Sequence, residues 1–177
     1  MAIPSGAGRG LALIGATLDA VIIKICAALV AVMVLIVWLG ILSRYGLSLG
    51  ITWTEELSRY IMIWAALLAI PVGVFRREHI GFELMFSLLP ESGRKPLRAL
   101  LDIIAIAFFG FLAWYGVGMT LQGSNQFATI FGMSMMVPFA AVPVSAGLSA
   151  FQATVLLVRD VTLAPDEMPG VQMEEAE

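Results

Sequence analysis

The sequence predicts an all-α integral membrane protein with four transmembrane helices, a short interfacial helix, and N- and C-termini that are both cytoplasmic. The first reason is composition: 60% of the 177 residues are hydrophobic and 13% are charged, whereas a soluble domain is about 45–50% apolar and about 25% charged. The second is that the apolar residues form four runs close to the roughly 20-residue length that crosses a bilayer core. The third is that basic residues gather at one predicted end of these runs, as they do on the cytoplasmic side of membrane proteins.

Residues 1–20 are expected to form an N-terminal segment and an interfacial lead-in, followed by a first span at 21–43. The apolar run that starts at Leu11 is interrupted by Asp19 and Lys24 and then continues for a full span. This is too long for a cleaved signal peptide, whose apolar region has about 7–15 residues. Lys24 can extend its ammonium group to the headgroups, so both charges are expected to mark the membrane edge.

The second span is predicted at 53–75, and charged residues occupy its first turn. Thr52 and Glu55 have the spacing of a capping box, in which each side chain accepts a bond from a free backbone N–H. Glu55 and Arg59 are four residues apart and are expected to pair on one helix face. The uncharged run after Arg59 is too short to cross a bilayer. The helix must therefore begin near residue 53, which places these charges and Glu56 at the membrane edge or just inside it.

The third and fourth spans are predicted at 97–121 and 137–158. Between the second and third spans, residues 80–89 are apolar but too short to cross the membrane, and they fit a brief helix on its surface. Asp102 lies four residues after Arg98, so these two side chains are expected to pair at the headgroup level.

Three prolines are expected to shape the helices. Pro71 removes one backbone hydrogen bond and should bend the second span near Leu67. Pro138 suits the first position of a helix, where no N–H is needed. Pro143 should kink the interior of the fourth span.

The four spans define a membrane domain at 21–159, and residues 160–177 form an acidic tail that is expected to be solvated and mobile. With the N-terminus inside, eight of the ten basic residues are cytoplasmic, which is the bias that fixes orientation in membrane proteins. These eight are Arg9, Lys24, Arg76, Arg77, Arg94, Lys95, Arg98 and Arg159. Arg44 and Arg59 lie outside, so the charged turn of the second span faces the periplasm.

The residues alone leave several roles open for that turn. Glu55 and Glu56 are compatible with a proton or cation site, or with a cap at Glu55 and a headgroup position for Glu56. A third interpretation places the charges at the contact with another membrane protein, where a polar cluster fixes register. Trp53, Tyr60 and Trp64 form a stripe on one helix face, which fits a pocket lining, an interface belt or a packing ridge.

The motif around this turn resembles a known family. Arg44-Tyr45 is followed by Trp53, Glu55-Glu56-Leu57 and Arg59-Tyr60, and then by Arg76-Arg77 and His79-Ile80 after the span. This order resembles the DctQ-like small membrane subunit of tripartite ATP-independent periplasmic (TRAP) transporters. The resemblance covers residues from about 24 to 159.

The resemblance implies a small permease subunit of the bacterial inner membrane that scaffolds a large TRAP membrane subunit. The large subunit would carry out ion-coupled uptake of a small organic, carboxylate-bearing solute that a periplasmic solute-binding protein delivers. The residues expected to contact the large subunit are Arg44, Trp53, Glu55, Glu56, Arg59 and Tyr60, with Trp64 added because it extends the aromatic stripe. Arg76, Arg77 and His79 form a basic collar on the cytoplasmic side, expected to meet lipid phosphates or an acidic loop of a partner.

Other classes of function find little support in the sequence. One cysteine, Cys26, and one histidine, His79, cannot supply a thiol relay or paired haem ligands, and no cluster has metal-ligand spacing. We expect no catalytic residue, no cofactor and no nucleic-acid partner. Two alternatives stay open at this stage: a membrane anchor of a redox complex, and a stand-alone small exporter that uses Glu55 or Glu56.

The predicted topology can be tested with a reporter fused at Gln126, in the uncharged loop after the third span. We expect the reporter to be active on the periplasmic side, because two spans separate this loop from the 44–52 turn and both therefore lie on the same side of the membrane. Activity in the cytoplasm would overturn the topology.

Overall fold

The structure is a computed structural model that describes residues 6–49, 51–77 and 91–162. In this part of the chain, helix α1 (Gly6–Ile41) passes into a π-helical turn at Leu42–Gly46, and α2 follows at Trp53–Arg76. Helix α4 (Glu91–Gln122) ends in a 3-10 turn at Gly123–Asn125, and the short α5 (Met136–Phe139) precedes α6 (Ala141–Thr162). Four of these stretches are long and apolar enough to cross a membrane. The all-helical, four-span fold class is therefore confirmed, while the surface helix predicted at 80–89 and the tail from 163 onward lie outside the described residues.

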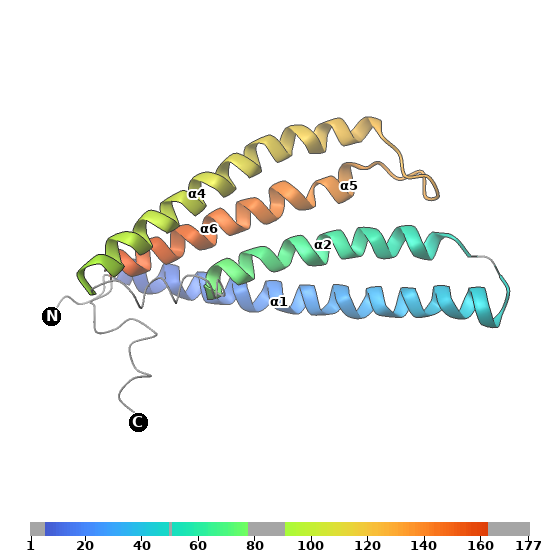
Figure 1. Ribbon diagram of the computed structural model, residues 1–177, viewed down its shortest axis with the longest axis horizontal. Helices are drawn as coiled ribbons and strands as arrows, with labels where there is room; N and C mark the ends of the chain where they lie inside the picture. Colours follow the sequence, from blue (N-terminus) through green and yellow to red (C-terminus); the bar gives the residue numbers. More distant parts are fainter. Residues whose placement is uncertain (1–5, 50, 78–90, 163–177) are drawn as a thin grey trace, which may run out of the picture.

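The helices form two antiparallel pairs. Helix α1 packs along α2, and α4 packs along α6, while α2 and α6 pack against each other and join the pairs. The start of α1 and the end of α6 lie at the same end of the bundle (Figure 1), which we call the inner end; the outer end holds the α1–α2 turn and the segment between α4 and α5. A chain with an even number of antiparallel spans begins and ends at the same end of the bundle.

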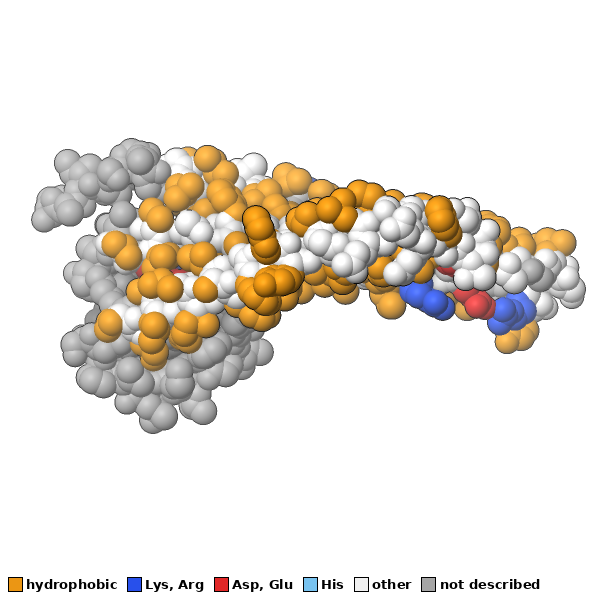
Figure 2. Space-filling view, turned by 90° about the horizontal axis from the view of Figure 1, so that it is seen from above, with side chains coloured by type: hydrophobic (Ala, Val, Ile, Leu, Met, Phe, Trp, Pro, Cys, Tyr) orange, Lys and Arg blue, Asp and Glu red, His pale blue; other side chains and the backbone are white. Residues whose placement is uncertain are grey.

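The four spans differ in how much of their surface the protein itself covers. In the most apolar windows, 44% of the residues of the last span and 33% of those of α2 are buried inside the protein, against 6% for both α1 and α4. Figure 2 accordingly shows hydrophobic side chains along most of the visible face. Helices α2 and α6 form the centre, and α1 and α4 present apolar faces to lipid or to another protein.

Small and polar residues let α6 approach its neighbours closely. Ser145, Ser149 and Gln152 are buried on α6. The Ser149 hydroxyl donates to the Ser145 carbonyl at 2.8 Å, and Gln152 Nε2 donates to the Gly15 carbonyl on α1 at 3.2 Å. Such bonds satisfy polar groups that have no water to bond with inside a bilayer.

Helix α1 differs from the predicted lead-in and span, because it is continuous from Gly6. No helix-breaking residue follows Gly15 in the lead-in, so nothing ends the helix there. Asp19 was expected at the membrane edge, but it is only 7% exposed. Its carboxylate accepts bonds from Arg76 Nη2 and Nε at 3.0 and 3.2 Å, and this tertiary pairing allows the charge to enter the bundle.

The other helices extend or divide the predicted spans. Helix α4 begins at Glu91, six residues before the predicted third span, and its candidate span begins at Pro96, which lies near the helix start and interrupts little of the hydrogen bonding. The fourth span is broken at Ala140, as expected from Pro143, which has no N–H to offer the carbonyl one turn earlier. Pro138 is the third residue of α5 and not its first.

The close contact at Gly15 gives a testable prediction. A Cβ atom there would lie 2.9 Å from Val155 Cγ1 and 3.0 Å from Phe75 Cε2. Gly15→Leu should therefore destabilise the bundle by about 1–3 kcal/mol, the usual cost of overpacking, measured as a lower unfolding temperature in detergent. Gly110→Ala, where the added Cβ meets nothing within 4 Å, is the control and should not lower that temperature.

Candidate interaction site

At the outer end, an exposed ion pair joins α1 to α2. The π-helical turn brings Arg44 over the first turn of α2, where its Nη2 lies 2.6 Å from Glu55 Oε1. The two side chains are 58% and 62% exposed, and Figure 2 shows basic and acidic groups close together near one end of the molecule. The predicted Glu55–Arg59 pair is thus wrong, because Arg44 takes this carboxylate. The predicted capping box is also wrong, because the Thr52 side chain makes no capping bond.

The neighbouring carboxylate of Glu56 binds a distant part of the same chain. Its Oε1 accepts bonds from the Tyr60 hydroxyl at 2.9 Å and from the Thr129 N–H at 3.1 Å. Its Oε2 accepts bonds from the N–H groups of Ile130 and Phe131 at 2.9 and 3.2 Å. Glu56 was assigned either to an ion site, to the headgroup layer or to a partner contact, and the structure instead shows it anchoring the segment between α4 and α5.

Sequence reasoning missed this anchor, although one signal was present. Successive backbone N–H groups in a turn form a binding site for an anion, and the segment has such a turn at Gly132, with φ +59°. A buried or partly buried carboxylate near an uncharged, glycine-containing loop is a candidate for such a bond. The sequence does not say which of the two adjacent glutamates would bind it.

The aromatic stripe faces the rest of the bundle. Tyr60 is buried, Trp53 meets Phe131 edge-on with ring centroids 6.5 Å apart, and Trp64 packs against the core cluster of Ile22, Leu68 and Val72. Of the motif residues expected at a partner interface, the exposed ones are therefore Arg44, Glu55 and Arg59. Beside them lies a shallow hollow of about 210 Å³, lined in part by Gly40, Thr54 and Ser58.

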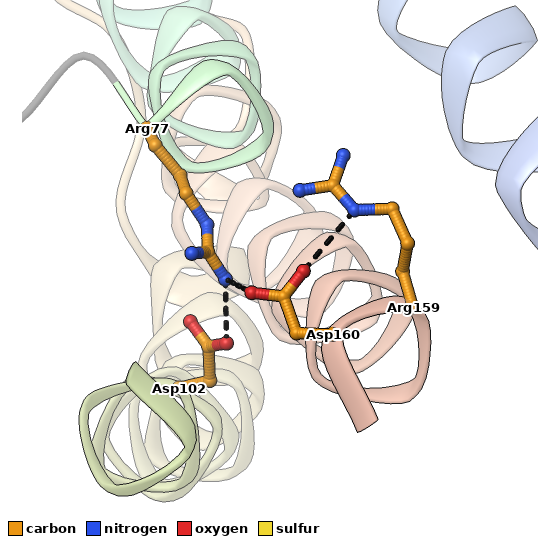
Figure 3. Close-up of polar contacts among 4 residues, drawn as sticks. All are labelled: Arg77, Asp102, Arg159 and Asp160. Carbon is orange, nitrogen blue, oxygen red and sulfur yellow. Dashed lines mark hydrogen bonds and ion pairs between the residues drawn. The ribbon is translucent and has the colours of Figure 1, made fainter. Parts of the chain in front are cut away.

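At the inner end, Arg77 holds three helices together (Figure 3). Its Nη2 lies 2.8 Å from Asp102 Oδ2 on α4 and 2.7 Å from Asp160 Oδ2 on α6. Asp160 Oδ1 is also 3.2 Å from Arg159 Nε. Of the predicted basic collar, Arg76 and Arg77 thus bind carboxylates within the chain, and His79 lies outside the described residues.

This network adds to one expectation and corrects another. Asp102 was expected to pair with Arg98, whose charge does act on it, and it also forms an ion pair with Arg77, whose side chain reaches α4 from the end of α2. Asp160 was assigned to a solvated tail, but it belongs to α6 and its side chain is only 10% exposed. Arg77 itself adopts a left-handed conformation with φ +52° at the end of α2.

These features define a class: a small, multi-span membrane protein whose polar groups hold its own helices and outer loop in place. Among the described residues, no group of three or more His, Cys, Asp and Glu side chains could bind a metal ion. Residues 33–163, more than half of the chain, match the DctQ component of tripartite ATP-independent periplasmic transporters. The chain therefore belongs to this family and is a transport protein, not an enzyme.

Individual relatives agree with this assignment. A Haemophilus influenzae chain named as a candidate TRAP transporter small permease is 29% identical over 137 residues, which cover 75% of this chain and 83% of the relative. The ectoine TRAP transporter small permease TeaB of Halomonas elongata is 23% identical, over 91% of this chain and 89% of its own. The sialic acid TRAP transporter permease SiaT of Haemophilus influenzae is 28% identical over 63% of this chain but only 18% of its own length. The redox-anchor and stand-alone exporter alternatives are set aside by this membership.

The Arg77 network gives a second prediction. Arg77→Ala removes one ion pair from each of two weakly exposed carboxylates, Asp102 and Asp160, so it should destabilise the protein by on the order of 3 kcal/mol. Arg77→Gly should destabilise the protein by roughly 1 kcal/mol less than Arg77→Ala does, because glycine adopts the left-handed conformation without steric cost. Both can be measured by thermal unfolding in detergent.

The matched control is Arg44→Ala, which removes an exposed ion pair and should change stability by less than about 1 kcal/mol. Equal losses for Arg44→Ala and Arg77→Ala would contradict the assignment of the inner network as the stabilising one.

Proposed function

We propose that this protein holds the large membrane subunit of its transporter in place and widens the static part of the complex. The observation that carries the proposal is the pattern of relatives. In SiaT, and in the isethionate TRAP transporter permease DctMQ of Oleidesulfovibrio alaskensis, the similar region occupies 18% of a much longer permease chain. In these relatives the similar segment and the large permease are parts of one chain. When the segment is a separate chain, as it is here, we expect it to act beside a large permease.

The structure supports a holding role over a transport role. The described centres of the spans carry no broken helix lined by charged groups, which are the usual marks of a substrate path. The internal ion pairs at the inner end and the Glu56 anchor at the outer end make the bundle rigid. The exposed apolar faces of α1 and α4 provide the area that a second membrane protein needs.

The remaining parts of the proposal follow from the transporter class and the charge pattern. We place the chain in the bacterial inner membrane with both termini in the cytoplasm, and assign ion-coupled uptake to the large subunit. The solute is a small organic molecule, with a carboxylate as the expected recognition group, delivered by a periplasmic binding protein. The relatives are named for sialic acid, isethionate and ectoine, so the solute is chosen by the other components.

The exposed charges of the outer end are proposed contact residues, and Glu56 supports them by anchoring the segment between α4 and α5. Replacing Arg59 or Glu56 by alanine should reduce co-purification with the large subunit at least severalfold and lower solute uptake in the same proportion, while membrane insertion is unchanged. Arg59 acts directly, since it is exposed. The measurement is the yield of large subunit on a tag fused to this chain, with uptake by whole cells.

Lys24→Ala is the control, because Lys24 is also exposed but lies on α1 away from the charged turn. It should leave both yield and uptake unchanged. Normal complex yield for both Arg59→Ala and Glu56→Ala would show that the interface lies elsewhere on the bundle.

A further inference from the structure

We infer that Glu56 is a positioning residue: it fixes the turn at residues 127–134, and this apolar turn contacts the large membrane subunit. The inference rests on the proposed function and deepens it, because it names the surface that meets the partner. It also changes the role of Glu56, whose carboxylate would act through the loop and not by touching the partner.

The turn is closed by backbone bonds of its own, in addition to those that it makes to Glu56. The Ala128 N–H donates to the Met133 carbonyl at 2.8 Å, and the Gly132 N–H donates to the Ala128 carbonyl at 3.0 Å. A bridge between Phe127 and Ser134 completes it. The turn therefore has a definite shape.

Glu56 then ties this shape to α2. The three N–H groups that it accepts belong to successive residues, 129 to 131, so one side chain sets the direction of the whole segment. Bonds from N–H groups to an ionised carboxylate are stronger than those between neutral groups. The Tyr60 hydroxyl also donates a hydrogen bond to this carboxylate, and the Trp53 ring packs against Phe131.

Three large apolar side chains of the turn are exposed. Phe127 is 67% exposed, and Ile130 and Phe131 are about half exposed. The chain carries no charged residue between Asp102 and Arg159, so no charge competes with an apolar contact here. The turn also contains no tryptophan or tyrosine, the residues that membrane-interface belts favour.

A membrane protein partner explains this surface better than lipid or a soluble protein does. Lipid is fluid and gains nothing from a loop held in one conformation, whereas a preformed loop lowers the entropic cost of binding a protein. Permanent interfaces are more apolar than those of transient complexes. The Trp53–Phe131 contact also joins the turn to the first turn of α2, which carries Glu55 of the exposed Arg44–Glu55 pair in the proposed contact surface.

The experiment compares loop protection with complex formation, using the full chain co-expressed with its large subunit. Glu56→Gln keeps the size of the side chain but removes the charge. Amide hydrogen exchange across residues 129–131 of the purified chain should become roughly tenfold faster, and the yield of large subunit should fall severalfold. Glu56→Asp keeps the carboxylate and should restore part of both.

Two controls separate the loop from the carboxylate. Glu55→Gln changes the adjacent carboxylate, which pairs with Arg44 and not with the turn, and should leave exchange at 129–131 unchanged. Ile130→Ser removes an exposed apolar side chain from an anchored turn, so it should lower complex yield while exchange at residues 129 and 131 stays slow. A photo-crosslinking residue at position 130 should capture the large subunit.

The inference is overturned if Glu56→Gln lowers complex yield without faster exchange, because Glu56 would then touch the partner itself. It is equally overturned if Ile130→Ser leaves the yield unchanged, or if the crosslinker captures lipid or the binding protein only. A wild-type chain that fails to co-purify with any large subunit would overturn the proposed function and the docking half of the inference together. The exchange data would still decide whether Glu56 positions the turn.

Discussion

Ionised groups inside this bundle are kept there by pairing, and the arrangement of the helices depends on it. Arg77 joins α2 to α4 and α6, while Arg76 joins α2 to Asp19 on α1. All four spans therefore meet through two adjacent arginines at the end of one helix. Taking charges out of water is expensive, and a charge left without its partner costs more than the pair contributed. The inner end is consequently the least replaceable part of the fold.

The outer end is held by different means. A single carboxylate, Glu56, replaces the arginine network and binds backbone N–H groups, so the loop there is fixed without any basic side chain. The only described ion pair at this end, Arg44–Glu55, is mostly exposed and adds little to stability. At the inner end the charged side chains thus bind one another within the chain. The outer end combines a fixed backbone with exposed side chains that can contact another protein.

The fold was predictable because its signals are local. The lengths of the apolar runs predicted the four spans, and Pro143 predicted the break before α6, because each signal depends on residues close together in the chain. The pairs were not predictable in this way. The sequence favoured Glu55–Arg59, but a helix pair four residues apart contributes only ~0.3–0.5 kcal/mol, and Arg44 takes the Glu55 carboxylate instead. It also favoured Arg98–Asp102, but it did not reveal that Arg77 from the end of α2 pairs with Asp102 as well. Glu56 and Asp19 could not be placed, because their partners are more than 50 residues away and are brought near only by packing.

The long uncharged stretch between Asp102 and Arg159 has a consequence for how the chain enters the bilayer. The hairpin of α4 and α6 can cross without moving any charge through hydrocarbon, so its insertion meets no electrostatic barrier. With both termini in the cytoplasm, as we propose, the first hairpin must carry Arg44, Glu55, Glu56 and Arg59 across, two of each sign. Their charges sum to zero, and pairing of Arg44 with Glu55 during translocation would lower the barrier further. The two halves of the protein therefore differ in what their biogenesis demands, although they cross the same membrane.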